Sequence, residues 1–123
     1  MRINRSLITN FDQDLNASNL IFAYESKTSN FTITETNGLI TYLVNATAGA
    51  ITVTLPTAAN NGSYFIIKKT DATANVVTLD AYSTETIDGA TTYVLYDQYN
   101  YVELVSNGTN WVVTNEYHNE VWT

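Results

Sequence analysis

Residues 50 to 69 contain the pattern that most limits what this chain can fold into. Ile51, Val53 and Leu55 alternate with threonines, so an extended chain has one apolar side and one hydroxyl-bearing side here. That alternation is typical of a strand with one buried face. Pro56 has no backbone N–H for a sheet ladder and disfavours helix at the residue before it, so the strand is expected to stop there.

After a polar loop, the chain returns through a second predicted strand, Tyr64 to Lys69. In its Tyr-Phe-Ile-Ile run both sets of alternate positions are apolar, until the two lysines. A strand that is apolar on both sides needs cover on both sides. The sequence leaves open whether a second sheet or another subunit provides it.

A hairpin is predicted upstream of this pair of strands. Asn37–Gly38 stands between strand patterns at residues 31–35 and 39–45. Both turn residues tolerate the positive φ that a tight hairpin needs, so we expect the two strands to pair with each other.

Later parts of the chain repeat the alternation of strand patterns and turn signals. Residues 76–80 read as a strand, Asp88–Gly89 as a turn, and Asn107–Gly108 as the turn between strands at 99–106 and 110–114. Such segments recur about every ten residues, and none has the 3.6-residue apolar period of a helix. The sequence therefore predicts an all-β fold, an antiparallel, jelly-roll-like β-sandwich with about eight or nine strands.

The chain has 123 residues, enough for one domain, and its beginning differs from the rest. We divide it into an N-terminal anchoring arm (1–30), a β-sandwich head domain (31–115) and a C-terminal tail (116–123). Short apolar clusters in the polar arm can pack back on its own domain or order against a partner. We expect the second, a particle anchor formed by Leu7, Ile8, Phe11, Leu20, Ile21 and Phe22.

Charge and residue usage argue against several classes of function. The net charge is -7, opposite to the basic surface that nucleic-acid binding needs, so no nucleic-acid partner is expected. There is no cysteine for a disulfide or thiolate site. No stretch approaches the roughly 20 apolar residues of a membrane span, and the polar residues 10–14 interrupt any signal-peptide core. We therefore expect no membrane insertion and no signal peptide, and release by lysis or within an assembled particle.

No residue set points to catalysis, and we expect neither an enzyme nor a cofactor. The only histidine, His118, stands in the tail, and without a cysteine it makes neither a Ser-His-Asp triad nor a zinc site. Acid pairs such as Glu85 with Asp88 are expected by chance among twelve acidic residues. Asp71, Asp80 and Asp88 have no EF-hand spacing, and we interpret them as turn-forming residues.

Nine tyrosines is a high number for this length, and several gather around one predicted loop. A tyrosine ring has an apolar face and a polar tip, which suits both sugar stacking and protein interfaces. The tyrosines can line strands and pack between subunits, or they can contact a ligand. The candidate receptor or glycan contacts are Tyr96, Tyr99 and Trp111, and the candidate subunit interface is Tyr64, Ile66 and Val105.

The order and spacing of the segments have a counterpart in a known class of protein. The matching residues are Ile51 to Pro56, Tyr64 to Lys68, Val76 to Asp80, Glu85 to Gly89 and Tyr101 to Val113. Together they resemble a module, covering about residues 39–113, of phage tail fibres and related virion fibre or spike proteins. In these proteins a small β-sandwich head commonly trimerises and meets the host surface. The resemblance implies a homotrimer with a noncatalytic, structural role.

Fibre proteins usually carry a shaft, whereas only about thirty residues precede the module here. This favours a short capsid-mounted spike, head fibre or capsid decoration protein over a tail fibre. The sequence thus predicts a viral structural protein on the external surface of the virion, held to other capsid proteins by residues 1–30. Its loops would serve host attachment, with a host surface glycan as a candidate partner. The alternative is a carbohydrate-binding module.

Overall fold

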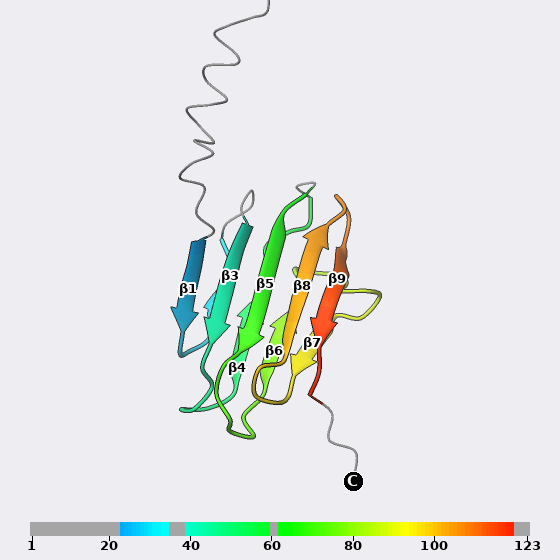
Figure 1. Cartoon of the computed structure of the whole chain (residues 1–123). Helices are drawn as coiled ribbons and strands as arrows, with labels where there is room; N and C mark the ends of the chain where they lie inside the picture. Colours follow the sequence, from blue (N-terminus) through cyan, green and yellow to red (C-terminus); the bar gives the residue numbers. More distant parts are fainter. Residues whose placement is uncertain (1–22, 35–38, 60–61, 120–123) are drawn as a thin grey trace, which may run out of the picture.

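The computed structural model describes residues 23–34, 39–59 and 62–119, which form nine strands and no helix. Five strands make one sheet in the order β1-β3-β5-β8-β9, called sheet A here, and four make sheet B in the order β2-β4-β6-β7. Figure 1 shows sheet A in front of sheet B. The strands are β1 Ala23–Lys27, β2 Phe31–Thr32, β3 Leu39–Val44, β4 Ile51–Thr54, β5 Tyr64–Lys69, β6 Val77–Asp80, β7 Thr92–Leu95, β8 Tyr101–Ser106 and β9 Trp111–Tyr117.

The all-β, sandwich-like architecture agrees with the prediction, but both sheets are mixed rather than antiparallel. Strands β1, β3 and β5 run parallel in sheet A, and β2, β4 and β6 run parallel in sheet B. The reason is that the chain changes sheet at every connection from β1 to β6 (Figure 1). Parallel neighbours need a long crossover, and here each crossover contains a strand of the opposite sheet. The antiparallel pairs are β5 with β8, β6 with β7, and β8 with β9.

This topology makes the predicted hairpin of residues 31–35 with residues 39–45 wrong, because β2 and β3 lie in different sheets. Its turn, Asn37–Gly38, lies outside the described residues. The other two turn predictions are confirmed. Asn107–Gly108 joins the antiparallel strands β8 and β9, with Gly108 at a φ of 92°. Asp88 and Gly89 have φ values of 49° and 86°, as a tight turn between Ile87 and Ala90 requires.

Side chains at alternate positions of each strand enter the space between the sheets. In β4, Ile51 and Val53 are buried and Thr52 is exposed. In β5, Phe65 and Ile67 are buried, whereas Tyr64 and Ile66 point to the opposite side of sheet A and are partly exposed. Sheet B therefore covers one side of β5, and the other side forms part of the outer face.

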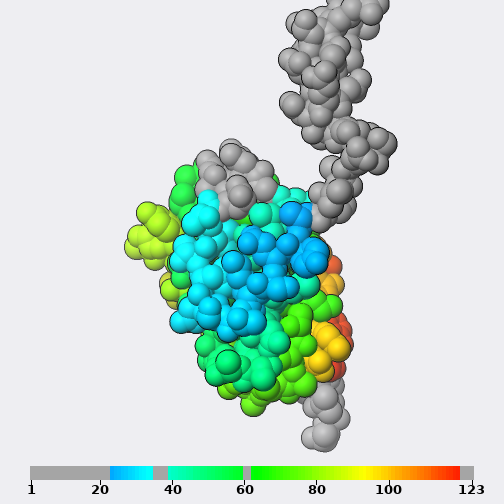
Figure 2. All heavy atoms as spheres, turned by 90° about the vertical axis from the view of Figure 1, so that its left-hand side faces the viewer, coloured from blue at the N-terminus to red at the C-terminus, as the bar shows by residue number. Residues whose placement is uncertain are grey.

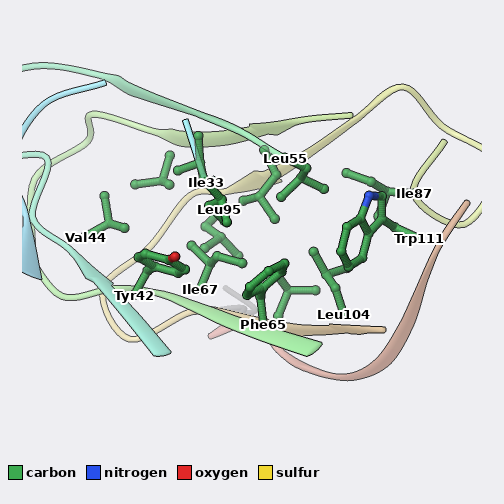
Figure 3. Close-up of a cluster of buried hydrophobic side chains, with 14 of the residues drawn as sticks. Ile33, Tyr42, Val44, Leu55, Phe65, Ile67, Ile87, Leu95, Leu104 and Trp111 are labelled. Atoms are coloured by element: carbon green, nitrogen blue, oxygen red, sulfur yellow. The ribbon is translucent and has the colours of Figure 1, made fainter. Parts of the chain in front are cut away.

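Side chains from both sheets interdigitate in one core (Figure 3). An aromatic series runs through it: Phe31 lies 5.2 Å from Tyr42, Tyr42 lies 6.1 Å from Phe65, and Phe65 lies 5.5 Å from Trp111, measured between ring centroids. The indole N–H of Trp111 donates a hydrogen bond of 3.2 Å to the carbonyl oxygen of Pro56. Trp111 thereby joins β9 to the segment that follows β4. Because its indole N–H is hydrogen-bonded, the burial of Trp111 leaves no donor unpaired.

The sheets extend beyond the predicted head domain of residues 31–115. β1 lies within the predicted arm, where it pairs with β3, and β9 continues to Tyr117. Figure 2 looks onto the β1 edge of the sandwich, where β1 in blue lies beside the cyan residues that follow it. The predicted anchor residues Leu7, Ile8, Phe11, Leu20, Ile21 and Phe22 lie outside the described residues.

Candidate functional site

The outer face of sheet A carries three rows of side chains that cross the strands, as the pairing register shows. In-register neighbours point to the same side of a sheet, so each row is continuous. We name the rows by their chemistry. The apolar row is Leu39, Tyr64, Val105 and Val112; the middle row is Tyr24, Thr41, Ile66, Glu103 and Asn115; the aromatic row is Ser26, Leu43, Lys68, Tyr101 and Tyr117.

The β3 and β5 residues of the apolar and middle rows form a groove on this face. Leu39, Thr41, Tyr64 and Ile66 line a shallow hollow with a volume of about 400 Å³. Leu39 leaves 39% of its surface exposed. Four in-register residues with aliphatic or aromatic side chains make a continuous apolar strip, which is unlike the scattered single apolar residues of an ordinary surface.

One polar contact orders the groove. The Tyr64 hydroxyl donates a hydrogen bond of 2.7 Å to the Glu103 carboxylate. This bond, followed by burial, raises the pKa of Tyr64, because both favour the protonated phenol. The carboxylate is thus engaged at the border between the apolar and middle rows, and the Tyr64 ring is held against the sheet.

The outer face of sheet B has a different composition. One of its rows contains Thr52, Thr78 and Val94 across β4, β6 and β7. A second row contains mostly threonines and one acid: Thr32, Thr54, Asp80 and Thr92. Hydroxyl groups are suited to contact with water, so the two outer faces of one small sandwich differ sharply in how much apolar surface they present.

At the other end of sheet A, the aromatic row meets the β7–β8 loop. The Lys68 ammonium lies 5.4 Å from the ring centroid of Tyr99 and 5.7 Å from that of Tyr101. The Tyr101 and Tyr117 rings stack with centroids 6.1 Å apart and an interplanar angle of 24°. Strands β5, β8 and β9 and one loop thus supply a single aromatic cluster around a cation.

The structure brings together one of the two predicted residue sets and divides the other. Tyr64, Ile66 and Val105 meet on the outer face of sheet A, where Tyr64 and Val105 are direct cross-strand partners. Tyr96 and Tyr99 are exposed on the β7–β8 loop. Trp111, predicted as a third ligand contact, is only 1% exposed and lies in the core.

Trp111 was misplaced because alternation shows that a strand residue has a side but not which side is covered. Sequence reasoning also missed Leu39 and Val112 in the apolar row, and Lys68 and Tyr117 beside the exposed tyrosines. Only the pairing register places these residues together. The signal in the sequence was weak: Lys68, the residue before the last in β5, lies on the same side of the strand as the outward Tyr64 and Ile66.

The acids considered for catalysis have structural hydrogen bonds. The Glu85 carboxylate accepts from the Thr57 hydroxyl at 2.7 Å and from the Ala58 N–H at 2.8 Å. The Asp88 carboxylate accepts from the Val113 N–H at 3.0 Å. Both carboxylates therefore tie loops to the sandwich.

His118 lies where the two sheets meet at the β7 edge. Its Nε2 atom lies 2.6 Å from the Tyr93 hydroxyl, which also bonds to the Glu116 carboxylate. Burial, followed by the bond to Glu116, raises the pKa of Tyr93. This cluster fastens the end of β9 to β7 and so connects sheet A with sheet B.

Among residues 23–34, 39–59 and 62–119, no group of three or more histidine, aspartate or glutamate side chains is placed to hold a metal ion. The same part of the chain contains no helix that could cross a membrane. Comparison with protein-family models and with curated protein sequences found no match to this chain.

Proposed function

We propose that this protein is a noncatalytic structural component of a virus particle, a short homotrimeric fibre, spike or capsid decoration protein. One observation carries the proposal: the outer face of sheet A carries a continuous apolar row, whereas the outer face of sheet B is lined mainly with threonines. An apolar strip in water is unfavourable, and a second copy of the chain removes it from solvent. Copies that meet through sheet A leave the hydroxyl-bearing faces of sheet B on the outside of the assembly.

The shape of the groove favours contact between copies. Leu39 and Ile66 border a hollow that a side chain from a neighbouring copy can fill, and Val105 and Val112 extend the same row. Apolar side chains set in shallow hollows are typical of the central part of a protein interface. The number of copies, three, comes from the resemblance to fibre and spike heads.

The direction of the chain suggests which end faces the particle. β1 begins with Ala23, which pairs with Ile40 next to Leu39. The preceding residues, including the proposed anchor, therefore join sheet A at the end that carries the apolar row. The aromatic row and the β7–β8 loop lie at the opposite end (Figure 1), which under this proposal points away from the particle and toward the host.

The assembly is tested by size-exclusion chromatography with light scattering at micromolar concentration. We expect a mass about three times the 13.7 kDa of one chain. Leu39→Lys and Val105→Lys place charges on the apolar row and should reduce the mass to that of a monomer. The matched control Thr52→Lys, on the outer face of sheet B, should leave it unchanged. A monomeric wild-type protein would overturn the assembly, and would point to cover by the chain's own terminal segments.

The anchor is tested by removing residues 1–22. The deletion stops before Ala23 because β1 is a strand of sheet A. We expect a folded head that no longer joins virus particles, detected by mass spectrometry of purified particles. Incorporation at the wild-type level would refute the anchoring role of this segment.

A further inference from the structure

From the aromatic row we infer that the end of sheet A opposite the apolar row binds an acidic saccharide, with Lys68, Tyr99, Tyr101 and Tyr117 as the binding residues. The inference deepens the host-contact part of the proposed function and does not depend on the assembly. It replaces the predicted set of Tyr96, Tyr99 and Trp111, since Trp111 is buried.

The aromatic faces at this end are accessible. Tyr99 is 53% exposed and Tyr117 is 44% exposed, and Tyr101 is partly exposed between them. A sugar ring has apolar C–H faces edged by hydroxyl groups, so a tyrosine with a flat face and a polar tip is suited to it. The side-chain amide of Asn115, which donates to the Tyr101 hydroxyl at 3.3 Å, adds a polar group beside the rings.

The charge of Lys68 suggests an acidic ligand. Among the described residues, the lysine salt bridges join Lys27 to Glu25 and Lys69 to Asp71, and Lys68 takes part in neither. Its ammonium is held between two tyrosine rings in a protein whose net charge is -7. A cation that has no carboxylate partner within the described part of the chain, in a protein of net negative charge, can pair with a carboxylate on a ligand.

The cluster is organised in advance of binding. The Tyr99 N–H donates a 2.8 Å hydrogen bond to the Lys69 carbonyl oxygen. This bond holds Tyr99 at a φ of 71°, which a bulky residue rarely adopts. Strained backbone is often retained where it positions a functional group, and here it brings the Tyr99 ring toward Lys68. Rings that are already fixed lose little conformational entropy when a ligand stacks on them.

The tyrosine-rich composition favours a saccharide over other anions. Phosphate-rich ligands such as nucleic acids are recognised by several basic groups, whereas this cluster has one cation and three phenol rings. A single carboxylate on a ring-shaped, hydroxylated ligand matches one ammonium, stacked aromatic faces and nearby amide and phenol groups. Uronic and sialic acids have this chemistry.

The test measures binding of the full chain to sialyllactose and to oligogalacturonate by isothermal titration calorimetry. Lactose and the carboxyl-reduced oligomer serve as the neutral counterparts. We expect binding of at least one acidic probe that is about five-fold tighter than that of its neutral counterpart, and that weakens at high salt. Lys68→Gln should remove this difference, and Tyr99→Ala or Tyr117→Ala should weaken binding about three- to ten-fold. Tyr82→Ala, an equally exposed tyrosine in the β6–β7 connection, is the matched control and should change nothing.

Light scattering on the same samples shows whether a negative result concerns the saccharide site or the proposed oligomer. An assembled protein that binds neither acidic probe at millimolar concentration, or binds the neutral counterparts equally well, overturns the inference and leaves the assembly standing. A monomer that binds an acidic probe through Lys68 overturns the assembly alone. If Tyr117→Ala lowers the oligomer mass, the aromatic row is covered by another copy, which contradicts a ligand site there.

Discussion

The Nζ atom of Lys69 lies 2.7 Å from Oδ2 of Asp71, and their side chains are only 0% and 4% exposed. Asp71 also accepts the Thr73 N–H at 3.1 Å and the Ala46 N–H at 2.7 Å. One buried carboxylate thus joins the end of β5, the loop that follows it and the turn after β3. This confirms for Asp71 the expectation of a turn-forming aspartate, and adds a buried ion pair that the sequence did not indicate.

Asp71→Asn should destabilise the fold strongly. The substitution leaves the buried Lys69 ammonium without its counter-charge, and removal of one partner from a buried pair costs about 3–5 kcal/mol. Chemical denaturation should show the loss as a lower midpoint with an unchanged slope. Asp97→Asn, at an exposed acid, is the control and should cost less than about 0.5 kcal/mol. Lys69→Met added to Asp71→Asn should recover part of the stability; an equal or greater loss in the double variant would argue against an unpaired charge as the cause.

The same carboxylate should make stability fall in acid. Burial alone would raise the pKa of Asp71, but the hydrogen bonds from Lys69, Thr73 and Ala46 outweigh it and hold the pKa below its ordinary 3.8. A carboxyl whose pKa is lowered by folding contributes stability above its unfolded pKa, and that contribution is lost as the pH falls through the folded value. Below about pH 4 we expect wild-type stability to lose about 1.4 kcal/mol more per pH unit than Asp71→Asn does. Parallel acid titrations of the two proteins, followed by circular dichroism, test this expectation. Equal losses of stability in the two proteins would contradict it.

The burial of Trp111 can be measured directly. The chain has two tryptophans, so Trp122→Phe leaves Trp111 as the sole emitter when the excitation wavelength is one that tyrosine does not absorb. We expect emission shifted to the blue and little quenching by acrylamide, because the indole is 1% exposed and packs on Phe65. After unfolding in denaturant, the same residue should emit at longer wavelength and be quenched readily, which provides the internal control. Strong quenching in the native protein would restore Trp111 as a surface residue.

Substitutions of Gly89 in the Asp88–Gly89 turn can distinguish the cost of backbone strain from the cost of a steric clash. Gly89 has a φ of 86°, and a Cβ built on it meets nothing within 4 Å. Gly89→Ala should therefore cost about 1 kcal/mol through conformation alone. Gly89→Asn should cost clearly less, because asparagine tolerates positive φ. Thermal unfolding of both variants gives the comparison, and equal losses would mean that the turn does not depend on its backbone conformation.

Local patterns in the sequence determined which residues of a strand share a side and where two of the turns fall. Ile51 and Val53 are buried, as their alternation with threonines indicates, because a two-residue period is a property of the chain itself. The turns at Asp88–Gly89 and Asn107–Gly108 follow for the same reason, since positive φ is a preference of the residues that form them.

Tertiary structure decided which strands pair, in which direction, and which face of each sheet is covered. The chain crosses between the sheets after β2, so a turn signal that predicts a hairpin stands instead in a connection between layers. Trp111 and Lys69 are buried because a second sheet and a loop cover them, which depends on contacts far away in the sequence. The apolar and aromatic rows likewise exist only once β3, β5, β8 and β9 are in register, because side-chain alternation specifies a face but not its neighbours.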